Sequence, residues 1–182
     1  MNSGRSSRAR SIRALDGFAM HWTVDSTMPD SRVLDYWESF LATRADGDEL
    51  RVRGYLTERF GDSAQLANEL SALIVSGVKT ATCSSVWEWG HTGGALPREG
   101  LMTIVLNGSG APMCIIETVS VATMAYQDVT PEIAYAEGEG DRTLEYWRRV
   151  HWDYFSRVLP KLGHEPGLEM VLTCERFRVV HR

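Results

Sequence analysis

The stretch LMTIVL-NGSGAP-MCIIETVSV, residues 101–121, decides the fold class of this chain. Its outer segments, Leu101–Leu106 and Met113–Val121, are rich in the aliphatic and β-branched residues that favour strands. The six residues between them include two glycines and a proline, which is the composition of a turn. The stretch therefore predicts an antiparallel β-hairpin.

Helices are expected on both sides of this hairpin. Apolar residues recur with the 3.6-residue period of an amphipathic helix, and capping residues stand at the expected ends. Gly77 is a predicted left-handed helix stop, and Pro160 predicts a kink or an earlier end in the last helix. The predicted helices are Ser31–Thr43, Ser63–Ser76, a short one beginning at Thr130-Pro131-Glu132, and a long one from Arg142 to about Leu162.

Two further strands complete the prediction. The residues after Gly77, VKTATCSSVWEW, predict entry into a strand, and Met170–Val180 predicts a closing strand. Three segments are interpreted as irregular: Asp46–Arg53, His91–Gly94, and the acidic Ala136–Asp141. The expected fold class is α+β, with several antiparallel strands and helices at both ends of the sequence.

Composition sets limits on the cellular setting and on cofactors. No apolar run approaches the roughly 20 residues that span a bilayer, so no membrane partner is expected. The basic, Ser-rich residues 1–28 are interpreted as a flexible arm and residues 29–182 as one domain, with a cytoplasmic location. The 3 cysteines are widely separated and the 5 histidines have no metal-ligand spacing, so neither disulfides, metals nor cofactors are expected.

The net charge of −5 restricts a role with nucleic acids. Non-specific nucleic-acid binding depends on a basic excess, because neutralisation of phosphates supplies the affinity. Any such role is therefore expected from a local pocket or patch rather than from a wholly basic surface.

One candidate site follows the predicted stop at Gly77. The segment Ser76–Cys83 places Lys79 beside the hydroxyls of Thr80 and Thr82. A lysine in a partly dry pocket can lose its proton near neutral pH, and a nearby threonine can then act as a nucleophile. The alternative is that the threonines are ordinary strand residues and that Lys79 is a solvated turn residue.

A second candidate is the run AEGEGD, in which three acids alternate with glycines before a helix. Glycine lets the backbone pass close to a ligand, and Glu137 or Glu139 could supply a general acid or base. Asp141 alone is explained as the cap of the following helix. Trp87 and Trp89 could stack on bases, but tryptophans in a strand more often belong to the core.

Several segments in this order resemble the longer bacterial subgroup of the ASCH domain family. SGVKTATCS resembles the family signature, and Ala134–Phe155 resembles the acidic loop and long helix of that subgroup. FGD at residues 60–62, LPREG at 96–100 and CERFRVV at 174–180 are similar to further family segments. The resemblance covers about Val33 to Val180 and implies a PUA-like β-barrel of mainly antiparallel strands with flanking helices.

The resemblance also implies a cleft for a nucleoside, a nucleotide or single-stranded RNA. Some bacterial relatives are amidohydrolases that deacetylate N4-acetylcytidine with a Lys, a Thr and a Glu and no metal, and others are described as ribonucleases. Carried over by position, the catalytic residues are Lys79 as base, Thr82 as nucleophile and Glu139, with Glu137 as the alternative acid. The candidate substrate-binding residues are Thr80, Ser84, Trp87, Glu137 and Arg142.

Two departures qualify the resemblance. Val78 stands where the family usually has Lys or Arg, and the hydrolase branch is shorter than this chain. The mechanism also requires Lys79 to lie in the turn before the strand, because residues 79 and 82 of a regular strand point to opposite faces. Three functions remain: an amidohydrolase, which is favoured, a ribonuclease, and a non-catalytic RNA-binding module.

Overall fold

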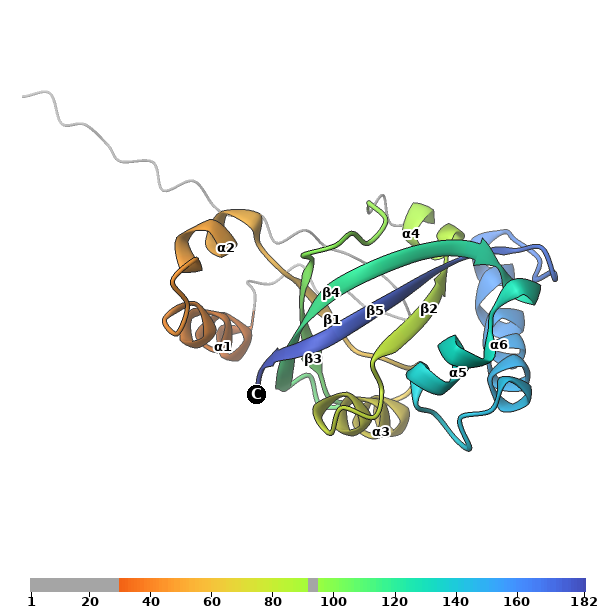
Figure 1. Ribbon diagram of the computed structural model, residues 1–182, viewed down its shortest axis with the longest axis horizontal. Coiled ribbons are helices and arrows are strands. Elements are labelled where there is room, and N and C mark those ends of the chain that lie inside the picture. The colour runs from red at the N-terminus through yellow and green to blue at the C-terminus, as the bar shows by residue number, and fades with distance from the viewer. Residues whose placement is uncertain (1–29, 92–94) are drawn as a thin grey trace, which may run out of the picture.

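A curled five-stranded sheet organises the chain. The computed structural model describes residues 30–91 and 95–182, so the predicted arm and most of the predicted loop at 91–94 lie outside the described residues. The sheet has the order β1-β3-β4-β5-β2 and forms a half-barrel around which the helices lie (Figure 1). Its strands are β1 (Leu56–Glu58), β2 (Ala81–Ser85), β3 (Met102–Leu106), β4 (Pro112–Ala125) and β5 (Val171–His181).

The register of the strands confirms the predicted hairpin. β3 and β4 pair antiparallel, with Ile104 opposite Ile115, and a register shift lies between Val105 and Leu106. β4 pairs antiparallel with β5, and β5 pairs antiparallel with β2, whereas β1 joins the edge of β3 in parallel. The sheet is therefore mainly antiparallel, as predicted, and β2 is joined to it only through the C-terminal strand.

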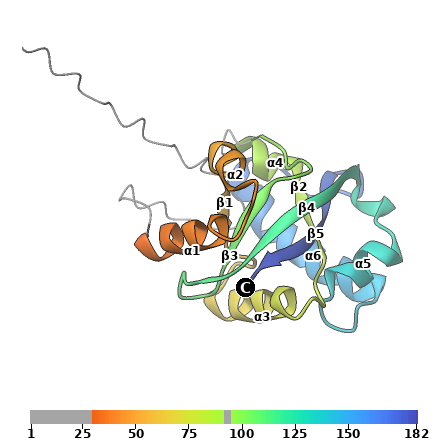
Figure 2. The ribbon, with the colours of Figure 1, turned by 60° about the vertical axis from the view of Figure 1, so that its left-hand side comes forward.

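The helices cover the two ends and one side of the sheet. α1 and α2 lie together at one end, α5 and α6 lie at the other, and α3 lies below the sheet in the view of Figure 1; Figure 2 shows the same grouping from a second direction. Ser63 caps α3 and Thr143 caps α6, each by accepting a hydrogen bond from a backbone N–H of the first turn. The helices are α1 (Ser31–Leu41), α2 (Gly47–Arg53), α3 (Ala64–Val75), α4 (Val86–His91), α5 (Pro131–Glu137) and α6 (Leu144–Val158).

Three apolar clusters hold these elements on the sheet. The cluster nearest the candidate site joins α6 to β2 and β5, and its members include Trp147, Phe155 and Leu172. The second cluster packs α1 against β3 and β4, and the third packs α3 against Phe60 and Phe177. A fully buried side chain of this size contributes about 1.5–3 kcal/mol, so these clusters fix the elements that carry the site.

Four predictions of local structure were wrong. The supposed loop at Asp46–Arg53 contains α2, which is stabilised by acids in its first turn and arginines in its last. Only one large apolar residue of α2, Leu50, is buried, so the segment lacks the apolar period by which helices are recognised. The strand after Gly77 ends at Ser85, and both Trp87 and Trp89 lie on α4.

The other two corrections concern the acidic run. Its first two residues, Ala136 and Glu137, form the last part of α5 rather than a loop. Asp141 does not cap α6 directly, because its carboxylate accepts hydrogen bonds from the backbone N–H and hydroxyl of Thr143, which is the cap. The predicted early end at Pro160 is confirmed, since α6 gives way there to a 3-10 turn, Leu159–Leu162.

Candidate functional site

Lys79 lies in the turn before β2, as the proposed chemistry required. Gly77 ends the helix α3 with a φ of 77°, a left-handed conformation that glycine adopts without strain. The next two backbone N–H groups, of Val78 and Lys79, both donate to the Leu73 carbonyl and close the turn. The side chain of Lys79 is therefore not tied to the alternation of the strand and points away from it into the interior.

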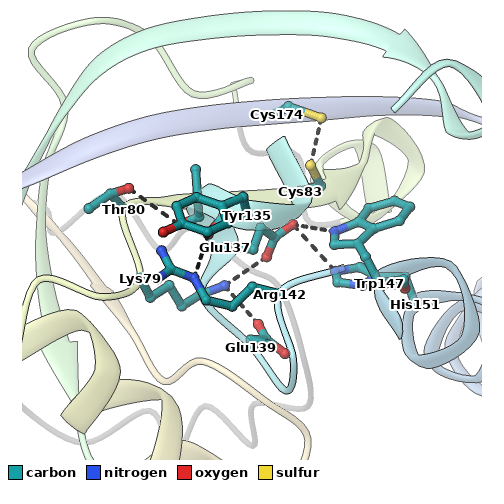
Figure 3. Close-up of polar contacts among 11 residues, drawn as sticks. Lys79, Thr80, Cys83, Tyr135, Glu137, Glu139, Arg142, Trp147, His151 and Cys174 are labelled. Carbon is teal, nitrogen blue, oxygen red and sulfur yellow. Dashed lines mark hydrogen bonds and ion pairs between the residues drawn. The ribbon is translucent and has the colours of Figure 1, made fainter. Parts of the chain in front are cut away.

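The ammonium group of Lys79 is held between two carboxylates (Figure 3). Its Nζ donates to Glu137 Oε2 at 2.7 Å and to Glu139 Oε1 at 2.8 Å. Lys79 and Glu137 are each only 1% exposed, whereas Glu139 is 20% exposed and is the acid that solvent reaches. The interpretation of Lys79 as a solvated turn residue is therefore wrong.

The protonation state of Lys79 also differs from the expectation. Burial acts to lower the pKa of Lys79, but the charges and hydrogen bonds of Glu137 and Glu139 outweigh burial and hold this pKa above its ordinary value. The prediction of a neutral lysine that acts as a base is therefore wrong. An ammonium in this position can instead stabilise negative charge that develops on a bound ligand.

Glu137 is the buried anchor of this arrangement. Its Oε1 accepts a hydrogen bond from Trp147 Nε1 at 2.8 Å and lies 3.5 Å from His151 Nε2. Burial acts to raise the pKa of Glu137, but Lys79 and His151 outweigh it, so the pKa lies well below the ordinary range. Glu137 is thus a fixed carboxylate that holds the ammonium in place.

The glycine after Glu137 makes the close approach possible. Gly138 has a φ of 75°, and a Cβ at this position would lie 2.6 Å from the backbone oxygen of Val78. Only glycine combines this conformation with contact between the two backbones. The glycine between the two acids that hold Lys79 is therefore explained by the geometry of the Lys79 site.

A cavity of about 270 Å³ opens beside the ion-paired cluster. Lys79, Thr82, Glu137 and Glu139 all line it, so three of the predicted catalytic residues and the alternative acid share one space. Its volume lies near the lower end of the roughly 300–1,000 Å³ typical of small-molecule sites. The remaining walls are Phe60, Gly61, Leu66, Leu70, Cys83, Tyr146, Val150, His151, Asp153, Tyr154 and Arg157.

The other predicted substrate-binding residues do not line this cavity. Thr80 is bound to the backbone, with its N–H 2.7 Å and its hydroxyl 3.3 Å from the Ala136 carbonyl. Ser84 Oγ accepts a hydrogen bond from Trp89 Nε1 at 2.8 Å. Trp87 stacks on His164 with 4.4 Å between the ring centroids. Arg142 directly follows the acidic run, is half-buried, and lies beside the ion-paired cluster (Figure 3).

The sequence prediction missed a group of interior carboxyls next to this site. Glu175 lies on β5 opposite Thr82, and burial raises its pKa to about 7 against the lowering effect of a hydrogen bond from Thr118. Burial and the charge of Glu175 raise the pKa of Glu58 to about 8, although Glu58 keeps some contact with solvent. The sequence did contain a signal for the burial of Glu175: this acid stands inside the apolar run VLTCERF, where its neighbours on the same face of the strand are buried.

Glu88 is a further buried acid that the prediction missed. It is 3% exposed and accepts hydrogen bonds from the hydroxyl of Tyr154 at 2.6 Å and from the N–H of Ser85 at 2.8 Å. These bonds join α4, α6 and the end of β2. No signal in the local sequence distinguishes this acid from a solvated helix residue.

Two thiols close the inner side of the site. Cys83 and Cys174 are direct neighbours on β2 and β5, with 2.6 Å between the sulfur atoms, and both are free and buried (Figure 3). Within residues 30–91 and 95–182, no group of three or more His, Cys, Asp and Glu side chains is arranged to hold a metal ion. In the same ranges, no helix has the length and apolar character needed to cross a membrane.

Comparisons with known proteins agree with this architecture. A family model described as ASCH domain matches residues 57–181. The fold is similar to the crystal structure of an ASCH domain from Lactobacillus crispatus, at 32% identity and a TM-score of 0.79, covering 84% of this chain and 96% of that one. It is also similar to protein EF3133 from Enterococcus faecalis, at 35% identity and a TM-score of 0.75, covering 83% and 89% of the two chains. Among curated proteins, none matches the chain.

Proposed function

The chain belongs to the ASCH domain family, with the PUA-like α+β fold, and from that premise we propose that it hydrolyses the amide bond of an acylated nucleoside. The substrate that fits best is N4-acetylcytidine or a close relative with an acyl group on an exocyclic amine. The observation that carries this proposal is the buried Lys79 ammonium, which lies between two carboxylates in the wall of a cavity that also holds Thr82.

The proposed chemistry differs from the expected one in the role of the lysine. Because its pKa is raised, Lys79 stays protonated and stabilises the oxyanion that forms when Thr82 Oγ attacks the acyl carbon. Glu139, the carboxylate that solvent reaches, takes the proton from the Thr82 hydroxyl.

The second half of the reaction returns that proton. When the carbon–nitrogen bond breaks, Glu139 protonates the leaving amine, and the acyl group remains on Thr82 as an ester. Glu139 then takes a proton from the water that attacks the ester carbon, and gives this proton to Thr82 Oγ as the ester bond breaks. The acyl group leaves as a carboxylic acid and the threonine hydroxyl is restored. Glu137 touches no reacting atom in this scheme and acts as a positioning residue for Lys79.

The charge distribution favours this reading over RNA cleavage. Both carboxylates beside Lys79 already balance its charge, so a phosphodiester in the cavity would meet Glu137, Glu139 and Asp153 before an uncompensated cation. A cavity of about 270 Å³ suits a single base or nucleoside rather than a strand. A non-catalytic binding module would need neither a buried ammonium nor a hydroxyl beside it.

The test is release of cytidine from N4-acetylcytidine by the purified protein. Thr82→Val and Glu139→Gln are expected to lower kcat by about 10²-fold or more, since each removes a group that acts on the reacting atoms. The matched controls are Thr123→Val and Glu145→Gln, which change exposed residues outside the cavity and leave kcat intact. Absence of release at high protein concentration, with the protein folded, would refute the proposal.

A further inference from the structure

Arg142 is the one non-glycine residue with a positive φ, at 64°, in the described part of the chain. Residues with a side chain rarely adopt this conformation, and those that do occur often at functional sites. The turn that imposes it is tight, because the backbone N–H of Arg142 donates to the Glu139 carbonyl at 2.9 Å. Arg142 therefore stands one turn away from a carboxylate of the cavity.

The side chain of Arg142 is held flat over an exposed aromatic ring. Its Cζ lies 3.6 Å from the centroid of the Tyr135 ring, and its Nε donates to the Tyr135 carbonyl at 3.0 Å (Figure 3). Tyr135 is 58% exposed, so this contact is at the surface. Two anchors thus fix the plane of a guanidinium that would otherwise be free to move in solvent.

The charge of Arg142 is not balanced by a neighbour. No carboxylate within residues 30–91 and 95–182 forms an ion pair with it, although the loop that carries it contains two acids, Glu139 and Asp141. The acid next to it, Asp141, is bound to Thr143 instead. Nε is used by the Tyr135 carbonyl, whereas Nη1 and Nη2 have no hydrogen-bond partner in the described part of the chain. These two nitrogens form the fork that binds phosphate oxygens.

We propose that Arg142, oriented by Tyr135, binds a phosphate group of the substrate while the modified base occupies the cavity beside Lys79. This inference rests on the proposed function for the identity of the base. The site then separates two tasks: the balanced ammonium of Lys79 acts on the neutral acyl group, and the unbalanced guanidinium of Arg142 holds the anion outside. The preferred substrate is therefore a nucleotide, either free or within single-stranded RNA.

The test compares binding of cytidine, cytidine 5′-monophosphate and a short single-stranded RNA by calorimetry at low salt. The native protein is expected to bind the monophosphate about tenfold more tightly than cytidine, because one charge-assisted hydrogen-bonded pair contributes about this much to affinity. If the RNA binds more tightly again, the phosphate belongs to a chain; if it binds no better, the natural ligand is a free nucleotide. Equal affinity for cytidine and its monophosphate would overturn the proposal, as would binding of neither.

Two variants separate recognition from folding. Arg142→Gly suits the left-handed backbone and is expected to keep the melting temperature while it abolishes the preference for the monophosphate. Arg142→Gln is expected to abolish the preference as well. Arg148→Gln is the control, since Arg148 is an exposed arginine that also donates to one backbone carbonyl, that of Gln127. If Arg142→Gly still prefers the monophosphate to cytidine, the assignment of Arg142 as the phosphate-binding residue is refuted.

These measurements do not depend on turnover. One outcome is that binding shows a preference for the monophosphate that requires Arg142, while N4-acetylcytidine releases no cytidine. In that case the phosphate site is supported and the proposed reaction is refuted. If N4-acetylcytidine and its 5′-monophosphate are deacetylated with equal kcat/KM, and cytidine and cytidine 5′-monophosphate bind equally, the proposed reaction is supported and the phosphate site is refuted.

Discussion

Replacement of both partners of the buried Lys79–Glu137 pair should cost less stability than the two single replacements together. Lys79→Met leaves the carboxylate of Glu137 in an interior where it is only 1% exposed, and such an uncompensated charge costs about 3–5 kcal/mol. Glu137→Gln keeps an acceptor for Trp147, and Lys79 keeps its bond to Glu139, so this change costs about 2–3 kcal/mol.

The double variant Lys79→Met/Glu137→Gln removes both charges at once. It leaves no unpaired ion at this pair, and its cost should therefore be no greater than that of Lys79→Met alone, about 3 kcal/mol. The coupling energy in the double-mutant cycle is then about 2 kcal/mol or more. For a chain of this size, each kcal/mol lowers the melting temperature by about 2–4 °C.

The assay is urea unfolding at pH 7, followed by tryptophan fluorescence. The exposed pair Arg178–Glu117, whose side chains are 68% and 22% exposed, is the matched control and should give a coupling energy below about 1 kcal/mol. If the effects of the two single replacements at Lys79 and Glu137 add within about 0.5 kcal/mol, the account of the buried pair is refuted.

Three other outcomes are expected. Because Glu175 has a folded-state pKa of about 7, raised above the unfolded value, its contribution to stability is full at acidic pH and is lost as the pH rises through 7. Glu175→Gln should accordingly raise the free energy of unfolding by on the order of 2 kcal/mol at pH 8 and change it little at pH 4; equal effects at both pH values would contradict this. Gly77→Ala places no atom near the added Cβ and should lower the free energy of unfolding by about 1 kcal/mol, because the backbone is left-handed there. Gly138→Ala brings the added Cβ against the Val78 backbone, so it should cost at least ~3 kcal/mol and release Glu139 from Lys79. Equal melting temperatures of the two variants would refute that distinction. The three buried thiols should react with a chromogenic disulfide reagent on the order of a hundredfold more slowly in the native protein than in urea. The reason is that burial raises the pKa of Cys114 to about 12 and the pKa of Cys83 well above its ordinary value. Rapid labelling of the native protein would contradict this and show that the interior opens.

The sequence predicted the frame of the fold because that frame is set by local patterns. The hairpin at 101–121, the helix before Gly77 and the early end at Pro160 each depend on residues within a few positions of one another. The helix α2 was not predicted, because a helix with one large buried side chain, Leu50, has no apolar periodicity in its sequence. Its stability comes from contact with α1 and from charges at its ends.

The candidate site was predictable in its residues but not in its charges. The family resemblance placed Lys79, Thr82 and the two acids together, and the cavity contains all of them. The protonation of Lys79 depends on two carboxylates that are 58 and 60 residues away, and nothing near Lys79 in the sequence indicates them. Interior acids such as Glu175 also follow from the pairing of distant strands.

The edge position of β2 has a consequence for how the protein is made. β2 pairs only with β5, and Cys83 meets its neighbour Cys174 across 91 residues of sequence. At a synthesis rate of about 5–20 residues per second, β2 leaves the ribosome roughly 5–20 s before the strand that completes its sheet. The pocket is therefore completed only after β5 has been synthesised, and a chain released before Val171 would present the signature residues without forming a site.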